Sequence, residues 1–215
     1  MYQLLSPQEH ARSRNAFVKA IFRILTVLLW IYSPAYAEME KIAHDCDQGI
    51  CFAWWPIIHE LSGWHQDKEA SLNYGFNAIV QDGLQFTDAE VVMYVIAPYK
   101  PRIPEDKTLT EHIENDRKSF LEDIPDLQIV ETESVLTKDG QRLRSFLFLP
   151  RTRGQWERVS YGEEGDFYIS FVVSSRTKNG MDETMKDYLR LIGQYQAISN
   201  PPPRRDALPQ GGSRP

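Results

Sequence analysis

The chain has 215 residues, 42% of them hydrophobic, and its 24 Lys and Arg against 30 Asp and Glu give a formal net charge of -6. This acidic balance disfavours nucleic acid and anionic membrane surfaces as partners, because both repel negative charge. The length suits one domain with a single core, and no internal repeat is evident.

The first 37 residues have the three parts of a secretory signal peptide. Basic residues from Arg12 to Arg23 precede an apolar run, and Ala35-Tyr36-Ala37 offers the small residues that a signal peptidase accepts. The sequence therefore predicts cleavage after Ala37 and export of the mature protein, either to the periplasm or out of the cell.

The apolar run is short for a membrane anchor. Residues 24–37 are 14 uncharged positions interrupted by Pro34, whereas a spanning helix needs about 20 apolar residues. An uncleaved anchor is the alternative interpretation. It adds residues 17–22 to the span and requires Lys19 and Arg23 to be buried or to reach the membrane surface.

The remaining chain divides into one predicted domain and a tail. Removal of residues 1–37 leaves a net charge of -9 on the mature protein. Residues 38–199 are expected to form a single domain. Residues 200–215, rich in Pro, Gly and Arg, carry too little apolar surface to offset the entropy of ordering, so they are expected to be disordered.

Cys46 and Cys51 are the only cysteines in the chain. In an oxidising compartment such a pair favours a crosslink over a metal site. Residues 47–50 between them contain the Asp and Gly of a tight turn, so the sequence predicts a Cys46–Cys51 disulfide. The alternative is a metal site in which the thiols, His44 and the flanking aspartates are ligands.

Three elements are predicted in the first half of the domain. Alternating apolar residues over 74–80 predict a strand with one buried face, and the apolar run 91–97 predicts a central strand covered on both faces. Thr108 followed by Glu111 forms a capping box, which predicts a helix that ends before Pro125.

Two hairpins and a helix are predicted in the second half. Strands over 127–137 and 142–149 flank an Asp-Gly turn, and strands over 155–161 and 167–173 flank a turn at 162–166. The closing helix is expected from about Asp182. Its apolar stripe has helical spacing and consists of Met181, Met185, Tyr188, Leu189, Ile192 and Tyr195.

This order of elements predicts the α+β class, an antiparallel meander with helices packed on it. Three features add a resemblance: Ser62-Gly63-Trp64 before the first strand, the passage from Thr110 to Leu149, and the final helix MDETMKDYLRLIGQY. With the second hairpin, they resemble the PsbP-like fold family over most of residues 57–195. That family includes an extrinsic photosystem subunit, a Ran-binding import factor and bacterial envelope proteins and chaperones. The resemblance implies a PsbP-like sandwich and a binding or assembly role, and it carries over no catalytic residue.

A search of the sequence for catalytic motifs finds no nucleophile elbow, P-loop, dinucleotide fingerprint, zincin motif or paired C-x-x-C. His44, His59 and His65 lie in a short span near the cysteines. They could belong to a metal site or to a hydrolase, although their spacing matches no known ligand pattern and surface histidines are the simpler interpretation. No cofactor is expected.

Trp54, Trp55 and Trp64 are the candidate binding residues. Three indoles within eleven residues could form an aromatic platform for a ligand or a partner. The simpler interpretation is an edge strand whose indoles cover the core. A strand directs adjacent Trp54 and Trp55 to opposite faces, so we expect one to be buried and the other to be partly exposed.

Four acidic residues of the second hairpin, Glu157, Glu163, Glu164 and Asp166, are expected to form an acidic rim, which is either a solvated turn or a surface for a basic partner. Taken together, the sequence predicts an exported, non-enzymatic binding or assembly module for a protein partner or a small ligand. The alternatives are a hydrolase or metal-dependent enzyme, and a passive envelope stress or stability factor.

Overall fold

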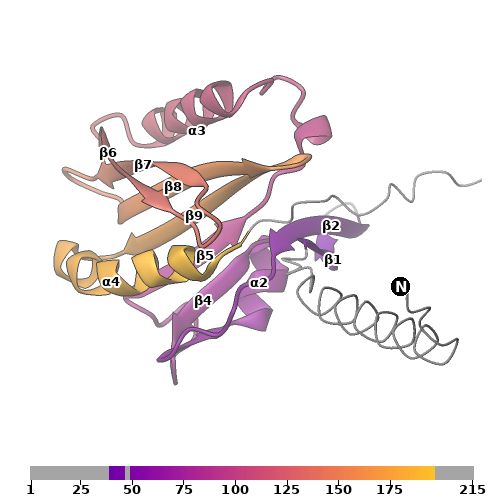
Figure 1. Cartoon of the computed structure of the whole chain (residues 1–215). Helices are drawn as coiled ribbons and strands as arrows, with labels where there is room; N and C mark the ends of the chain where they lie inside the picture. Colours follow the sequence, from indigo (N-terminus) through magenta and orange to yellow (C-terminus); the bar gives the residue numbers. More distant parts are fainter. Residues whose placement is uncertain (1–38, 47–48, 197–215) are drawn as a thin grey trace, which may run out of the picture. The chain divides into compact units, whose positions relative to one another are not determined.

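The computed structural model describes residues 39–46 and 49–196 (Figure 1). The predicted signal peptide, residues 1–37, and the predicted tail, residues 200–215, lie outside the described residues, so both stay predictions. Among the helices of the described part, none is both long and apolar enough to cross a membrane.

An antiparallel sheet of seven strands, in the order β3-β4-β5-β9-β8-β7-β6, forms the centre of the fold. Every neighbouring pair in it is antiparallel. The four strands β6 to β9 follow one another as a meander, which the two predicted hairpins anticipated. The strands are β3 (Trp64–Gln66), β4 (Asn77–Gln81), β5 (Val91–Ile96), β6 (Gln128–Leu136), β7 (Arg142–Leu149), β8 (Trp156–Glu164) and β9 (Phe167–Ser175).

Helix α3 (Leu109–Asp123) covers one face of this sheet and begins where the sequence predicts (Figure 1). The Thr108 hydroxyl accepts a hydrogen bond from the Glu111 backbone N–H at 3.2 Å, and the Glu111 carboxylate accepts one from the Thr108 N–H at 3.0 Å. This capping box provides acceptors for two donors that would otherwise lack them. Ile113 then packs, fully buried, in a cluster with Phe146 and Phe148 of β7.

Helix α4 (Lys178–Gln194) covers the opposite face (Figure 1). It begins before the predicted Asp182, because the Thr177 hydroxyl accepts a hydrogen bond from the Gly180 N–H and caps an earlier turn. In the predicted stripe Leu189 is exposed, whereas Leu191, which the stripe omitted, is buried. Helices that cover an antiparallel sheet confirm the α+β class.

The predicted strand over residues 74–80 is wrong in its first half. Tyr74 is instead the last residue of helix α2 (Lys68–Tyr74), which is capped at its start by Asp67 and closed by Gly75, and Gly75 adopts a left-handed φ of 72°. Strand β4 starts only at Asn77, and Ala78, Ile79 and Val80 are all buried. The strand is therefore covered on both faces, and the alternation that predicted one buried face does not hold.

The turn predicted at 162–166 is shorter than expected. Strand β8 continues to Glu164, which pairs with Phe167 across a two-residue turn formed by Gly165 and Asp166. Gly165 has a positive φ of 53°, which suits a tight hairpin. The extra strand length moves Glu164 out of the predicted loop and into the sheet.

A separate two-stranded hairpin consists of β1 (Met39–Cys46) and β2 (Gly49–Pro56), which are antiparallel. It is not an edge strand of the large sheet, as the sequence had suggested. Trp54 nevertheless joins this hairpin to the rest of the domain, because its ring lies 6.2 Å from the ring of Tyr99 and 5.4 Å from that of Phe167.

Candidate functional site

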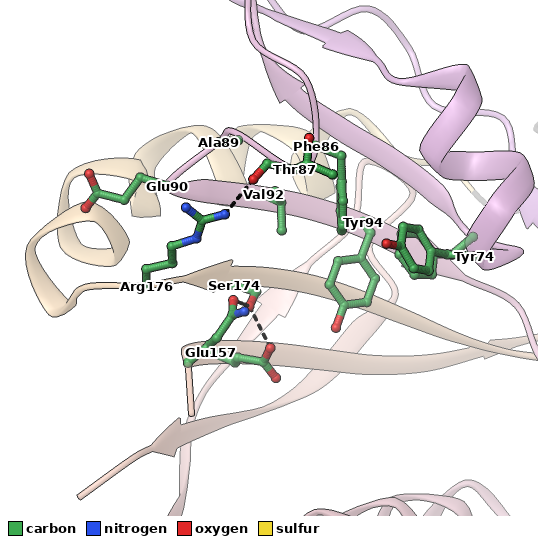
Figure 2. A pocket seen from close by; sticks show the side chains of 12 residues that line it. Tyr74, Phe86, Thr87, Ala89, Glu90, Val92, Tyr94, Glu157, Ser174 and Arg176 are labelled. Carbon is green, nitrogen blue, oxygen red and sulfur yellow. Dashed lines mark hydrogen bonds between the residues drawn. The ribbon is translucent and has the colours of Figure 1, made fainter. Parts of the chain in front are cut away.

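A cavity of 420 Å³ opens beside strands β5, β9 and β8, on the face of the sheet that α3 partly covers (Figure 2). Four aromatic side chains line it, together with several polar ones. We call it the aromatic groove. Its size lies within the range of small-molecule sites, which combine apolar walls with a few convergent polar groups.

The floor of the aromatic groove follows from strand register. Val92 of β5 pairs with Ser174 of β9, and Ser174 pairs with Glu157 of β8, so these three residues form one row across the sheet. Because side chains alternate along a strand, Tyr94 and Arg176 point to the same face as this row, at either side of it. All five residues line the cavity.

The aromatic wall combines residues from three parts of the chain. Tyr74 ends α2, Phe76 precedes β4, Phe86 lies in the loop before β5, and Tyr94 belongs to β5. Phe76 stacks on Tyr94 with ring centroids 4.6 Å apart, and Tyr74 stacks on Phe76 at 5.5 Å. Phe86 lies 5.3 Å from Tyr74. Tyr74 is 57% exposed, so the wall presents a large aromatic surface to solvent.

Asp67 connects the two segments that carry Tyr74 and Phe86 in this wall. One carboxylate oxygen accepts a hydrogen bond from the Ala70 N–H and caps α2, and the other accepts one from the Phe86 N–H at 2.9 Å. These hydrogen bonds, that of Ala70 first, hold the pKa of Asp67 below its usual range. One ionised side chain thus fixes both the helix that carries Tyr74 and the loop that carries Phe86.

Glu157 is the most unusual polar group of the groove. Its Oε1 lies 2.6 Å from Ser174 Oγ, whereas Oε2 is buried and has no hydrogen-bond partner among the described residues. Burial raises the pKa of Glu157 to about 7, the Ser174 hydrogen bond lowers it and the charge of Asp116 raises it further. This carboxyl therefore changes its charge near neutral pH.

Ser174 faces two oxygen atoms with a single hydroxyl hydrogen. Its Oγ lies 2.5 Å from Gln155 Oε1 and 2.6 Å from Glu157 Oε1. A hydroxyl donates only one hydrogen bond, so the second contact needs a hydrogen from the other side, either from the Gln155 amide or from a protonated Glu157. Ser174, Gln155 and Glu157 therefore form a small hydrogen-bond network in which the positions of the hydrogens can change.

A second ionisable cluster lies under α3, next to the groove. The Tyr161 hydroxyl donates a hydrogen bond to Asp116 at 2.5 Å. Burial raises the pKa of Asp116, an effect that the Tyr161 hydrogen bond opposes. Burial, followed by the charges of Glu157 and Asp116, also raises the pKa of Tyr94. The groove therefore lies in a region where negative charge is costly unless a partner neutralises it.

Asp106 and His112 form a buried pair that the sequence did not indicate. The Asp106 carboxylate lies 2.6 Å from His112 Nδ1, and the His112 ring stacks on Tyr168 with centroids 4.4 Å apart. The Tyr168 hydroxyl also donates a hydrogen bond to the Asp106 carbonyl. These contacts tie the loop before α3 to strand β9, so we assign the pair a structural role.

The three predicted tryptophans occupy different environments. Trp55 is 3% exposed and Trp64 is 6% exposed, and the Trp64 indole N–H donates a hydrogen bond to Asp187 of α4 at 2.9 Å. Trp54 is half-buried and lines a smaller cavity of 240 Å³ with Tyr99 and Arg102. Trp55 and Trp64 therefore belong to the core, and the three indoles do not form one exposed platform.

The predicted histidine cluster has no counterpart in the described part of the chain. His59 is exposed, and His65 lies 3.5 Å from Asp82 in an exposed ion pair. The side chain of His44 lies outside the described residues. Among the residues that are described, no group of three or more His, Cys, Asp or Glu side chains is suited to hold a metal ion.

The predicted disulfide cannot be placed, because the side chain of Cys46 lies outside the described residues. In the hairpin, the backbone of Cys46 pairs with that of Gly49, and Cys51 pairs with His44. The crosslink between Cys46 and Cys51 therefore stays a prediction.

The predicted acidic rim is wrong for two of its four members. Glu157 lies at the groove floor, and Glu164 is buried and accepts a hydrogen bond from the Tyr195 hydroxyl. Glu163 and Asp166 are exposed, and Glu163 forms an ion pair with Lys100 at 2.8 Å. Strand β8 extends further than predicted, which carries Glu164 into the sheet, whereas Glu157 already lay within the predicted strand.

Comparison with known proteins adds no family to this geometry. No protein-family model matches the sequence, and the search of curated proteins finds no similar sequence.

Proposed function

We propose that the protein is an exported, non-enzymatic binding module whose ligand occupies the aromatic groove. One observation carries the proposal: a carboxyl with an unpartnered oxygen, Glu157 Oε2, lines a 420 Å³ cavity beside four aromatic side chains. Oε2 is one of seven buried side-chain atoms that lack a hydrogen-bond partner in the described part of the chain, and it is the one whose residue lines this cavity. Buried polar atoms are almost always paired, so a ligand or a water in the cavity would supply the missing partner.

The export part of this proposal rests on residues 1–37 and on the prospective Cys46–Cys51 disulfide. The binding or assembly role is supported by the resemblance to the PsbP-like family, which rests on element order and patterning. A passive stability factor, by contrast, needs neither a concave cavity nor an exposed aromatic wall such as that of Tyr74.

A protein partner at the β1–β2 hairpin is a second candidate function, since exposed apolar side chains gather there. Ile50 is 71% exposed and Phe52 is 42% exposed, and the Lys41 ammonium lies over the rings of Phe52 and Trp54. A half-buried Trp54 flanked by a cation is the type of residue that anchors protein interfaces.

Ligand binding is best tested with the protein purified after export, so that the processed chain is used. Amide NMR spectra recorded with a library of aromatic fragments should show shifts at Val92, Tyr94 and Ser174. The variant Thr87→Trp fills the mouth of the groove, because Thr87 is exposed and lines the cavity, and it should abolish these shifts.

The matched control is Asp88→Trp, at an exposed neighbouring position that does not line the cavity. It should leave fragment binding unchanged. If no fragment shifts the groove signals, or if the Thr87 variant binds as well as the control, the groove is not the ligand site. Shifts confined to Phe52 and Trp54 would instead favour the hairpin.

A further inference from the structure

We infer that the ligand of the aromatic groove is a small organic cation, an apolar or aromatic ring that carries an ammonium or amidinium group, and that this group pairs with Glu157. The inference rests on the proposed function, and it names the class of ligand that the same site accepts.

The first argument is the unsatisfied oxygen of Glu157. Oε1 already contacts the Ser174 hydroxyl, and Oε2 has no partner in the described part of the chain. Glu157 lines the cavity, so a ligand at the groove floor lies next to this carboxyl. A carboxylate accepts hydrogen bonds only, so the complementary ligand group is a donor.

The second argument is the balance of charge around the groove. Two carboxylates, Glu90 and Glu157, line it, and Asp116 lies close enough to Glu157 to raise its pKa. The one cationic side chain that lines the cavity is Arg176, which is exposed and donates a hydrogen bond to the Thr87 carbonyl at the rim. A half-buried carboxyl at the floor, which a cation would ionise, and an exposed guanidinium at the rim favour a cation at the floor.

The aromatic wall is the third argument. The cavity that Glu157 lines also has a wall of four aromatic rings, in which Phe76 lies 4.6 to 5.8 Å, centroid to centroid, from each of Tyr74, Phe86 and Tyr94. The faces of such rings carry partial negative charge and attract organic cations, most strongly where water is excluded. A ligand with an apolar ring and a charged nitrogen satisfies both the wall and Glu157.

Protonation of Glu157 lowers the cost of placing this carboxyl in the groove floor. Burial raises the pKa of Glu157 to about 7, so near neutral pH a large share of the side chain is uncharged. A bound cation would favour the ionised form again, and proton release would accompany binding.

Three probes of matched shape test the inference: 2-phenylethylamine, which is a cation at pH 7.5, 2-phenylethanol, which is neutral, and 3-phenylpropionate, which is an anion. Their affinities for the exported protein would be measured by NMR titration of Tyr94 and Ser174. The cation should bind about tenfold more tightly than the alcohol, because a charge-assisted hydrogen bond is about twice as strong as a neutral one. The anion should bind most weakly.

Glu157→Gln should remove the preference for the cation while leaving binding of the alcohol within about twofold, because the amide keeps the shape and loses the charge. The control variant is Glu114→Gln, an exposed acid of α3 that does not line the cavity, and it should behave as wild type.

The outcomes distinguish a failure of the cation inference from a failure of the proposed function. If all three probes bind equally, or the alcohol binds best, the groove is a ligand site but the cation inference is wrong. Tightest binding of 3-phenylpropionate would also overturn it and would assign recognition to Arg176. Binding of none of the probes, together with no fragment shifts at the groove, would overturn both the inference and the proposed function. If Glu157→Gln fails to fold, the ranking of the three probes on wild-type protein still decides.

Discussion

The two faces of strands β5, β9 and β8 carry different polar networks, although each face includes a buried atom without a partner among the described residues, Arg158 Nε on the α4 face and Glu157 Oε2 on the groove face. On the α4 face, the Tyr188 hydroxyl lies 2.7 Å from Ser160 Oγ and donates a hydrogen bond to the Phe171 carbonyl, and Ser160 in turn contacts Ser145. On the groove face, Glu157 keeps one oxygen without a partner beside a 420 Å³ cavity. The first arrangement stabilises the fold, whereas the second leaves binding capacity unused.

The largest effect is expected on the α4 face. Tyr188→Ala should lower the free energy of unfolding by about 3 to 5 kcal/mol, because it removes a fully buried ring and its hydroxyl contacts with Ser160 and the Phe171 carbonyl. Urea unfolding measures this change, and Leu189→Ala, at an exposed neighbouring position of the same helix, is the control. A loss below about 1 kcal/mol for Tyr188→Ala would mean that this face is not the main core.

The adjacent indoles of β2, Trp54 and Trp55, also differ in burial. Trp55 is buried, so Trp55→Ala should cost about 3 to 5 kcal/mol, whereas the half-buried Trp54 loses only part of its ring contacts and Trp54→Ala should cost about 1 to 2 kcal/mol. Thermal melts of both variants test this. Equal and large losses would show that both indoles belong to the core and would remove the support for a partner at the hairpin.

The titration of Glu157 on the groove face should make the free energy of unfolding depend on pH. The pKa of Glu157 is raised from 4.5 to about 7 in the fold, so between these values the folded protein binds more protons than the unfolded chain. The stability contributed by the neutral carboxyl is therefore present below pH 4.5 and is lost as pH rises to about 7, by up to about 3 kcal/mol. Burial also raises the pKa of Asp116 in α3, which acts in the same direction.

Glu157→Gln removes one of these two titrating groups. Unfolding free energies measured from pH 5 to pH 8 should fall with pH in the wild type and fall less steeply in the variant. At pH 8 the variant should be the more stable protein, since it no longer buries a negative charge. Parallel slopes for the two proteins would show that Glu157 is solvated and already ionised.

The smallest effect concerns the β1–β2 hairpin, which forms a sheet of its own. A Cys46–Cys51 disulfide closes a short loop, so its reduction should cost only about 2 kcal/mol. Thiol trapping of the exported protein without reductant should label neither cysteine, and intact mass should match a chain that begins at Glu38. Labelling of both thiols would contradict the crosslink, and a mass that retains Met1 would contradict cleavage.

The sequence predicted those parts of the fold whose signals are local. Thr108 and Glu111 are three residues apart, and the capping box that they predict forms. The Asp139-Gly140 turn likewise joins β6 to β7 as expected. Helix α2 was missed because its own signals, Asp67 as the cap and Gly75 as the terminator, are weaker than the alternation of apolar residues that follows. Propensity and spacing act within one segment, so they need no knowledge of the rest of the chain.

The aromatic groove could not be predicted in this way, because its parts come together only across the sheet. Glu157 is an ordinary acidic residue in the sequence, and it becomes unusual only where β9 and β5 place Ser174 and Val92 beside it. Trp64 is close in sequence to Trp54 and Trp55, but its environment is set by a distant segment, because its indole N–H donates a hydrogen bond to Asp187 of α4.

The sequence by itself thus determined the α+β class, the meander and the helix that follows the capping box, since hydrophobic period and caps are properties of short segments. Only the tertiary structure decided which acidic residues are buried. The free energy of a carboxyl depends on how much water and how many hydrogen-bond donors surround it, and strands 60 or more residues apart in the chain, such as those of Tyr94 and Glu157, set that environment.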